Sequence, residues 1–96
     1  MNSKIKDENT DFLFDAILQL QSKEECYQFF EDLCTVAELK AMSQRMHVAK
    51  MLTEDRVYND IVKMTGASTA TISRVNRCLS YGTNGYRMAI DRAKEQ

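Results

Sequence analysis

Apolar side chains recur three or four positions apart along nearly the whole chain, the spacing that places them on one face of an α-helix. The first such run follows Asp11, an expected N-cap, and consists of Phe12, Leu13, Ala16, Ile17 and Leu20. Residues 1–10 are polar and predict a flexible N-terminal tail. The pattern therefore predicts that the folded domain occupies residues 11–96.

Two capping boxes mark the next helix starts, at Ser22-Lys23-Glu24-Glu25 and at Thr35-Val36-Ala37-Glu38. In such a box the hydroxyl and the carboxylate each accept a hydrogen bond from a backbone N–H that the helix leaves free. The first box predicts a helix with an aromatic face that includes Tyr27 and Phe30. The second box predicts the longest helix, over about residues 36–53, with methionines and leucines along one stripe.

The apolar pattern breaks at residues 53–56, which predict a loop. A short helix over about 57–65 is expected to bury Ile61, Val62 and Met64 and to end at Gly66. The next helix starts at about residue 69 and runs to about 79, and a turn over 81–86 leads into a last, mostly polar helix. No stretch alternates as a strand would, so we expect an all-α fold of six helices.

The two short helices over about 57–79 have the layout of a helix-turn-helix. Gly66 can adopt the left-handed conformation that a tight turn requires. Val62 on the first helix, with Ile72 and Val75 on the second, are spaced to meet in a small shared core.

Charge points to the same segment, because residues 61–90 contain four Lys or Arg and no acid although the net charge of the chain is −1. The candidate DNA-binding residues are the outward positions of the second helix together with one lysine before the turn: Lys63, Ser68, Thr69, Ala70, Ser73, Arg74 and Arg77. Small and hydroxylated side chains let a helix enter the major groove, and Arg can bind guanine or a phosphate. Double-stranded DNA is the expected partner, and an acidic partner protein is the alternative.

The remaining composition excludes several classes of protein. Ninety-six residues form one small domain, and no apolar run suggests a membrane span or a signal peptide, so we expect a cytoplasmic protein. Cys26, Cys34 and Cys78 have no zinc-site spacing and are expected to be reduced core residues. With His47 as the only histidine and no nucleophile–base arrangement, we expect no catalytic residue, no metal and no cofactor.

Two blocks of the sequence resemble the Trp repressor family: residues 34–45, CTVAELKAMSQR, and residues 66–74, GASTATISR. The chain is most similar to the YerC/YecD type of that family, whose pattern also runs through residues 24–33 and 79–82. The resemblance implies an intertwined homodimer of six-helix, Trp repressor-like chains that presents two helix-turn-helix reading heads. Burial of the aromatic N-terminal helices against the partner would also enlarge the core of so short a chain.

The same resemblance implies a candidate effector site. Arg45 and Arg74 stand at the positions of the two arginines that hold the corepressor of Trp repressor, and Thr35 and Thr71 match its pocket threonines. Val75 stands where that family has a glycine beside the indole, and inserting such bulk into a packed site typically costs about 1–3 kcal/mol. Tryptophan is therefore not the expected ligand. Control by another amino acid or a small carboxylate is an option that rests on Arg45 and Arg74 alone.

Together these patterns predict a non-enzymatic, sequence-specific transcriptional regulator, most simply a repressor. It would read a pseudo-palindromic operator through the helix over 69–79. A protein-interaction module that uses the same basic face remains the alternative. Arg45 could instead form a structural ion pair with Glu38 or Asp32.

Overall fold

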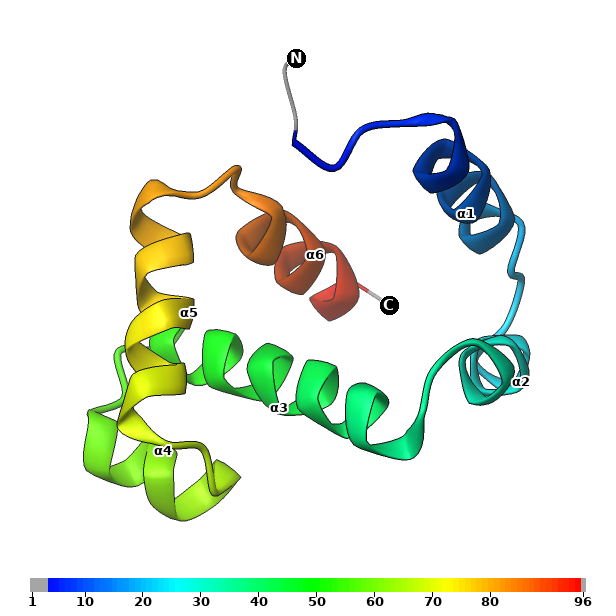
Figure 1. Ribbon diagram of the computed structural model, residues 1–96. Coiled ribbons are helices and arrows are strands. Elements are labelled where there is room, and N and C mark those ends of the chain that lie inside the picture. The colour runs from blue at the N-terminus through cyan, green and yellow to red at the C-terminus, as the bar shows by residue number, and fades with distance from the viewer. Residues whose placement is uncertain (1–3, 96) are drawn as a thin grey trace. The chain divides into compact units, whose positions relative to one another are not determined.

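The computed structural model describes residues 4–95, and six α-helices make up most of this range (Figure 1). The helices are α1 (Glu8–Leu18), α2 (Lys23–Leu33), α3 (Val36–Thr53), α4 (Tyr58–Thr65), α5 (Thr69–Tyr81) and α6 (Gly85–Lys94). No strand occurs in residues 4–95, which confirms the all-α fold class. None of the helices described is both long and apolar enough to span a membrane.

The chain divides into two compact units. The first extends to Val36, the first residue of α3, and holds α1 and α2. The second starts at Ala37 and holds the rest of α3 together with α4, α5 and α6. In the second unit α6 runs beside α3, and α4 and α5 lie at the C-terminal end of α3 (Figure 1). The helix-turn-helix and the residues that support it thus belong to one unit.

The first helix begins earlier than the sequence pattern predicts. Asp7, and not Asp11, is the N-cap of α1: its Oδ1 accepts a hydrogen bond of 2.7 Å from the backbone N–H of Thr10. The apolar stripe marks the face that a helix can bury, but a helix can start one turn before that stripe if a cap is present. Residues 8–10, assigned to the tail, are therefore helical, and residues 1–3 of that expected tail lie outside the described residues.

Both capping boxes stand where the structure starts a helix. Ser22 Oγ accepts from the N–H of Glu25 at 3.1 Å, and the Glu25 carboxylate accepts from the N–H of Gln21 at 2.8 Å, one residue before the cap. The third helix begins at Val36, directly after Thr35, and ends at Thr53, as predicted. Local hydrogen bonding at helix ends is thus encoded in short segments of sequence.

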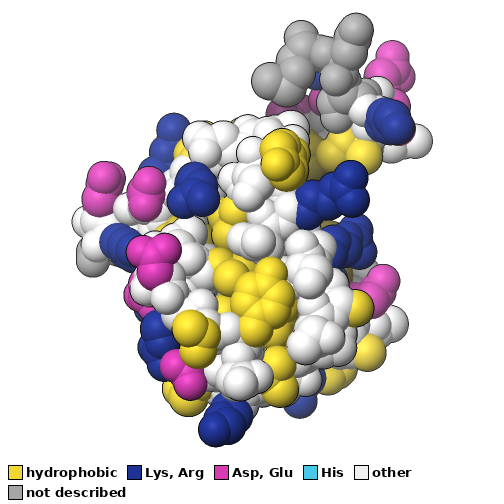
Figure 2. Space-filling view, turned by 90° about the vertical axis from the view of Figure 1, so that its left-hand side faces the viewer, with side chains coloured by type: hydrophobic (Ala, Val, Ile, Leu, Met, Phe, Trp, Pro, Cys, Tyr) yellow, Lys and Arg dark blue, Asp and Glu magenta, His cyan; other side chains and the backbone are white. Residues whose placement is uncertain are grey.

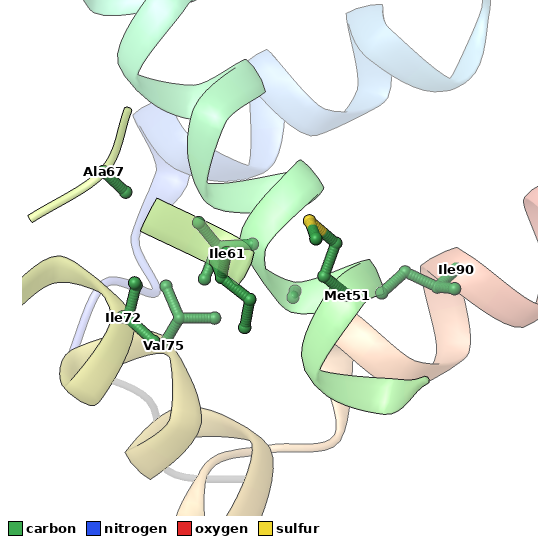
Figure 3. Packing of buried hydrophobic residues seen from close by; sticks show 8 residues of the cluster. Met51, Ile61, Ala67, Ile72, Val75 and Ile90 are labelled. Atoms are coloured by element: carbon green, nitrogen blue, oxygen red, sulfur yellow. The ribbon is translucent and has the colours of Figure 1, made fainter. Parts of the chain in front are cut away.

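One apolar cluster holds the second unit together. Its buried members come from all four helices and the turn: Val48, Ala49, Met51, Ile61, Ala67, Ile72, Val75 and Ile90. The side chain of Ile61 lies between α3 and the Ile72–Val75 pair of α5, and Ile90 joins the cluster from α6 (Figure 3). Val62 is partly buried against this cluster, so the shared core predicted for the two short helices is confirmed.

Two expectations about burial are wrong. Met64 is 62% exposed, because only one side of the eight-residue α4 faces the cluster and Ile61 occupies it. The cysteines are free, as expected, but none is in the core: Cys26 and Cys78 are exposed and Cys34 is half-buried. Cys78 lies on a part of α5 that the cluster does not reach, whereas Cys26 and Cys34 belong to the first unit, whose two helices have no buried residue.

Candidate nucleic-acid interface

The turn between α4 and α5 is fixed by its own hydrogen bonds. Gly66 ends α4 in the left-handed conformation, with φ 72° and ψ 5°, and its N–H donates to the carbonyl of Val62 at 2.9 Å. The Thr65 hydroxyl donates to the carbonyl of Ile61 at 2.7 Å and accepts from the N–H of Ala67 at 3.1 Å. Ala67 is buried in the cluster, so the backbone has little freedom before α5 begins.

Ser68 starts α5 as its N-cap. Its Oγ accepts from the N–H of Thr71 at 3.1 Å and lies 3.1 Å from Thr71 Oγ1, to which it can donate. The Ser68 hydroxyl is therefore engaged within the helix. A contact between Ser68 and DNA would use the lone pair that remains or would exchange the bond to Thr71.

A residue that the sequence pattern did not single out ties this turn to α3. Gln44 Nε2 donates to the carbonyl of Thr65 at 3.1 Å in a part-buried environment. The sequence carries no signal for this bond, since it joins residues 21 positions apart and involves a backbone acceptor that any residue would offer.

The outer face of α5 carries the residues predicted to bind DNA. Ile72 and Val75 point into the cluster, whereas the following predicted residues are all exposed: Ser68, Thr69, Ala70, Ser73, Arg74 and Arg77. Ala70, Ser73, Arg74 and Arg77 are spaced to share one helix face. Lys63, on α4, is exposed as well. The structure thus brings the small, hydroxylated and cationic side chains together on one unit.

The positive charge of this face is not neutralised within the described part of the chain. The ion pairs there join Lys6 to Asp11 at 3.5 Å and Arg56 to Asp60 at 3.9 Å, and they include none of Lys63, Arg74 and Arg77. The first turn of α5 holds no acid. Figure 2 looks onto the side on which α4 and α5 lie in Figure 1. It shows a central band of hydrophobic and uncharged polar side chains, with Lys and Arg but also Asp and Glu side chains around it. An anion meets free arginines and a positive helix end on this side.

The family model of the Trp repressor protein matches residues 8–94 of the chain. The chain belongs to the Trp repressor family. It is 54% identical over 92 residues to the uncharacterized protein YerC of Bacillus subtilis strain 168, a match that covers 96% of this chain and 88% of YerC.

Solved structures agree with this assignment. A TrpR-like protein from Eubacterium eligens ATCC 27750 superposes with a TM-score of 0.92 at 54% identity, and the match covers 97% of this chain and 96% of that one. A Staphylococcus aureus protein described provisionally as a Trp repressor gives 0.91 at 52% identity, over 97% and 93% of the two chains. The predicted Trp repressor-like fold and the similarity to the YerC type are confirmed.

The candidate effector residues of this Trp repressor family member lie in both units. Thr35 belongs to the first unit and is exposed, whereas Arg45 is half-buried on α3, Thr71 is half-buried and Arg74 is exposed on α5. Arg45 takes part in neither the Lys6–Asp11 nor the Arg56–Asp60 ion pair, and its role as an effector ligand or as a structural partner of Glu38 or Asp32 stays a prediction. The effector site itself stays a prediction.

Two open cavities on the second unit lie apart from these residues. One, of about 350 Å³, is lined by Met46, His47 and Lys50 of α3 and by Ile90, Ala93 and Lys94 of α6. The other, of about 390 Å³, is lined by Cys78, Gly82, Thr83, Gly85 and Tyr86. Within residues 4–95 no three His, Cys, Asp or Glu side chains come together in a way that could hold a metal ion.

Proposed function

We propose that this Trp repressor family member is a regulator of transcription that binds double-stranded DNA with α5 in the major groove. One observation carries the proposal: an exposed, acid-free face of α5 is presented on a turn that its own hydrogen bonds hold in place. A helix can read base edges only when its orientation is defined and its side chains let it approach closely.

We assign the candidate DNA-binding residues of α4 and α5 to different contacts with DNA according to their size and charge. Thr69, Ala70 and Ser73 are small enough to let the helix approach the bases, with hydroxyls that can bind base edges or phosphates. Arg74 and Arg77 offer bidentate contacts to guanine or to the backbone. Lys63 on α4 is suited to a phosphate, since the first helix of such a motif crosses the backbone.

A homodimer is part of the proposal. Neither α1 nor α2 has a buried residue, and the first unit leaves large apolar side chains in water: Phe12 is 75% exposed and Leu18 is 77% exposed. Full burial of such a side chain is worth about 1.5–3 kcal/mol. A second copy would cover this surface, and its two-fold axis would give two reading heads and a pseudo-palindromic operator with half-sites about one DNA turn apart.

We propose repression as the mode of regulation, since the family is named for repressors. Effector control through Thr35, Arg45, Thr71 and Arg74 is a further part of the proposal, with a small carboxylate between the two arginines. Val75 argues against tryptophan as that effector. Its side chain is buried in the core cluster with Ile61 and Ile72, and added bulk in such a packed site is destabilising.

Selection of random duplex DNA by the purified protein tests the proposal. It is carried out at about 150 mM salt, where purely electrostatic binding is weakened. The expected result is enrichment of a two-fold symmetric motif, with or without added amino acids. Weak binding without sequence preference, lost as salt rises, would overturn DNA reading and favour a protein partner for the same face.

A further inference from the structure

A side chain of α3 satisfies a backbone group at the end of α4. The last carbonyls of an α-helix have no partner within the helix, and Thr65 is the last residue of α4. Its carbonyl accepts from Gln44 Nε2 at 3.1 Å. Gln44 is thus bonded to the residue directly before the segment that connects the two helices of the motif.

Thr65 is also the residue that organises the turn. Its hydroxyl accepts from the N–H of Ala67 while it donates to Ile61, so the position of Thr65 determines that of the buried Ala67. The N-cap Ser68 follows directly. A continuous path of hydrogen bonds and covalent bonds therefore runs from Gln44 on α3 to the start of α5.

We propose that Gln44 is a positioning residue for DNA reading, which sets the direction in which α5 leaves the turn. The inference rests on the proposed function. Base contacts are directional hydrogen bonds that weaken steeply as their angles change, whereas attraction to phosphates tolerates small rotations. Loss of the Gln44 bond should therefore affect specific binding more than non-specific binding.

The test compares Gln44→Met with the wild type. Methionine has a similar length but cannot donate, and Ser43→Ala, at an exposed neighbouring position on the same helix, is the matched control. We expect the ratio of operator affinity to non-specific affinity to fall about two- to tenfold in Gln44→Met, the range that one hydrogen bond provides. The ratio should be unchanged in Ser43→Ala.

Gln44→Lys provides the rescue, because it restores a donor on a chain long enough to reach Thr65. Its added charge strengthens binding to every duplex, so the effect cancels in the ratio. We expect the ratio to recover toward the wild-type value. A ratio as low as in Gln44→Met would count against the donor as the reason for the effect.

Amide hydrogen exchange supplies a readout that needs no DNA. The N–H of Ala67 should exchange faster in Gln44→Met than in the wild type, while amides of α6 keep their protection. If the Ala67 amide exchanges faster in Gln44→Met but the affinity ratio is unchanged, the positioning role is wrong. The Gln44–Thr65 bond would then stabilise the turn without affecting DNA reading. If the wild type selects no operator, the proposed function fails and this role fails with it, and the exchange data still show whether the bond holds the turn.

Discussion

Single side chains on α5 divide into two groups with different tasks. Ile72 and Val75 are buried and hold the helix to the cluster, whereas Arg74 and Arg77 are exposed and unpaired within the described chain. An arginine that has no partner in its own chain loses little when it binds an external anion, because no internal bond has to break first. Substitution of these two arginines should therefore test the proposed DNA interface without disturbing the buried cluster.

Replacing either arginine should weaken operator binding. Arg74→Ala or Arg77→Ala is expected to cost about 1–3 kcal/mol if the side chain reads a base, with relaxed preference at one position of the motif. A phosphate contact would instead weaken binding to all sequences and reduce its salt dependence. Arg92→Ala on α6 is the control, and titration of labelled operator and scrambled duplex measures the effect. Full affinity in both arginine variants would contradict the assignment.

The glycines allow a second prediction at this scale. Gly66 has φ +72°, and a Cβ built there meets nothing within 4 Å, so Gly66→Ala should lose about 1–2 kcal/mol of unfolding free energy through backbone strain alone. In Gly82→Ala the new Cβ would clash with the Cys78 carbonyl oxygen, so the backbone must shift. Urea unfolding measures both changes.

Gly85→Ala is the matched control, since its Cβ would meet only Thr83 Oγ1, at 3.8 Å, and its φ is not in the left-handed region. Alanine within the first turn of a helix is favourable, so this variant should be neutral or slightly more stable. Gly66→Asn should lose less than Gly66→Ala, because asparagine tolerates the left-handed conformation better. Equal stability of Gly66→Ala and Gly85→Ala would show that the turn does not need a glycine.

At the scale of helices, the sequence predicted a helix end correctly wherever a capping residue stood next to the start or end of an apolar stripe. The boxes at Ser22 and Thr35 and the turn at Gly66 predicted helix ends to within one residue. The start of α1 was missed because Asp7 and Asp11 are both good caps and the apolar stripe favoured the later one. The choice between them is made by the bond from Thr10, which a pattern of apolar positions does not register.

The cap at Asp7 predicts a pH effect on α1. The N–H of Thr10 donates to the carboxylate and lowers the pKa of Asp7 below its ordinary value of 3.8. A group whose pKa is lowered by folding stabilises the fold above its unfolded pKa, and this contribution is lost as the pH falls through the lowered pKa. We therefore expect the first turn of α1 to fray as the pH falls below 3.8.

The amide shift of Thr10, followed by NMR as a function of pH, measures this effect at one site. Asp7→Asn should keep the cap, since asparagine caps helices as well as aspartate, and should abolish the pH dependence at Thr10. A midpoint at or above 3.8 for the wild type would contradict the account.

At the scale of the whole molecule, the two units differ in how well each one buries its apolar surface. The second unit has a closed cluster with eight buried residues, whereas α1 and α2 bury none. Large apolar side chains such as Phe12 and Leu18 contribute little to stability while they are exposed to water. This difference between the units is the basis for proposing that a second copy covers the first unit.

A charged residue introduced into the exposed apolar surface of the first unit should dissociate the proposed homodimer. We expect the wild type to sediment at twice the mass of the chain, and Phe12→Lys or Leu18→Lys to shift the equilibrium toward single chains, because a lysine would have to be desolvated at the interface. Tyr81→Lys, at a residue that is 86% exposed on the second unit, should not change the mass. A wild type that sediments as a single chain at all concentrations would rule out the homodimer.

The sequence by itself determined the features that depend on neighbouring residues. The all-α class, the six helices, the left-handed turn at Gly66 and the outward face of α5 follow from apolar spacing and from caps a few residues apart, because helices form and end through bonds between near neighbours. Two short blocks of residues also sufficed to place the chain in its family.

Only the tertiary structure decided which apolar positions are buried and which polar groups are bonded across the fold. Met64 and Cys78 satisfy the helical pattern but remain exposed, since the cluster can contact only part of each helix. The Gln44–Thr65 bond depends on the packing of α3 against the turn. Such contacts join residues far apart in the chain, and no local pattern specifies them.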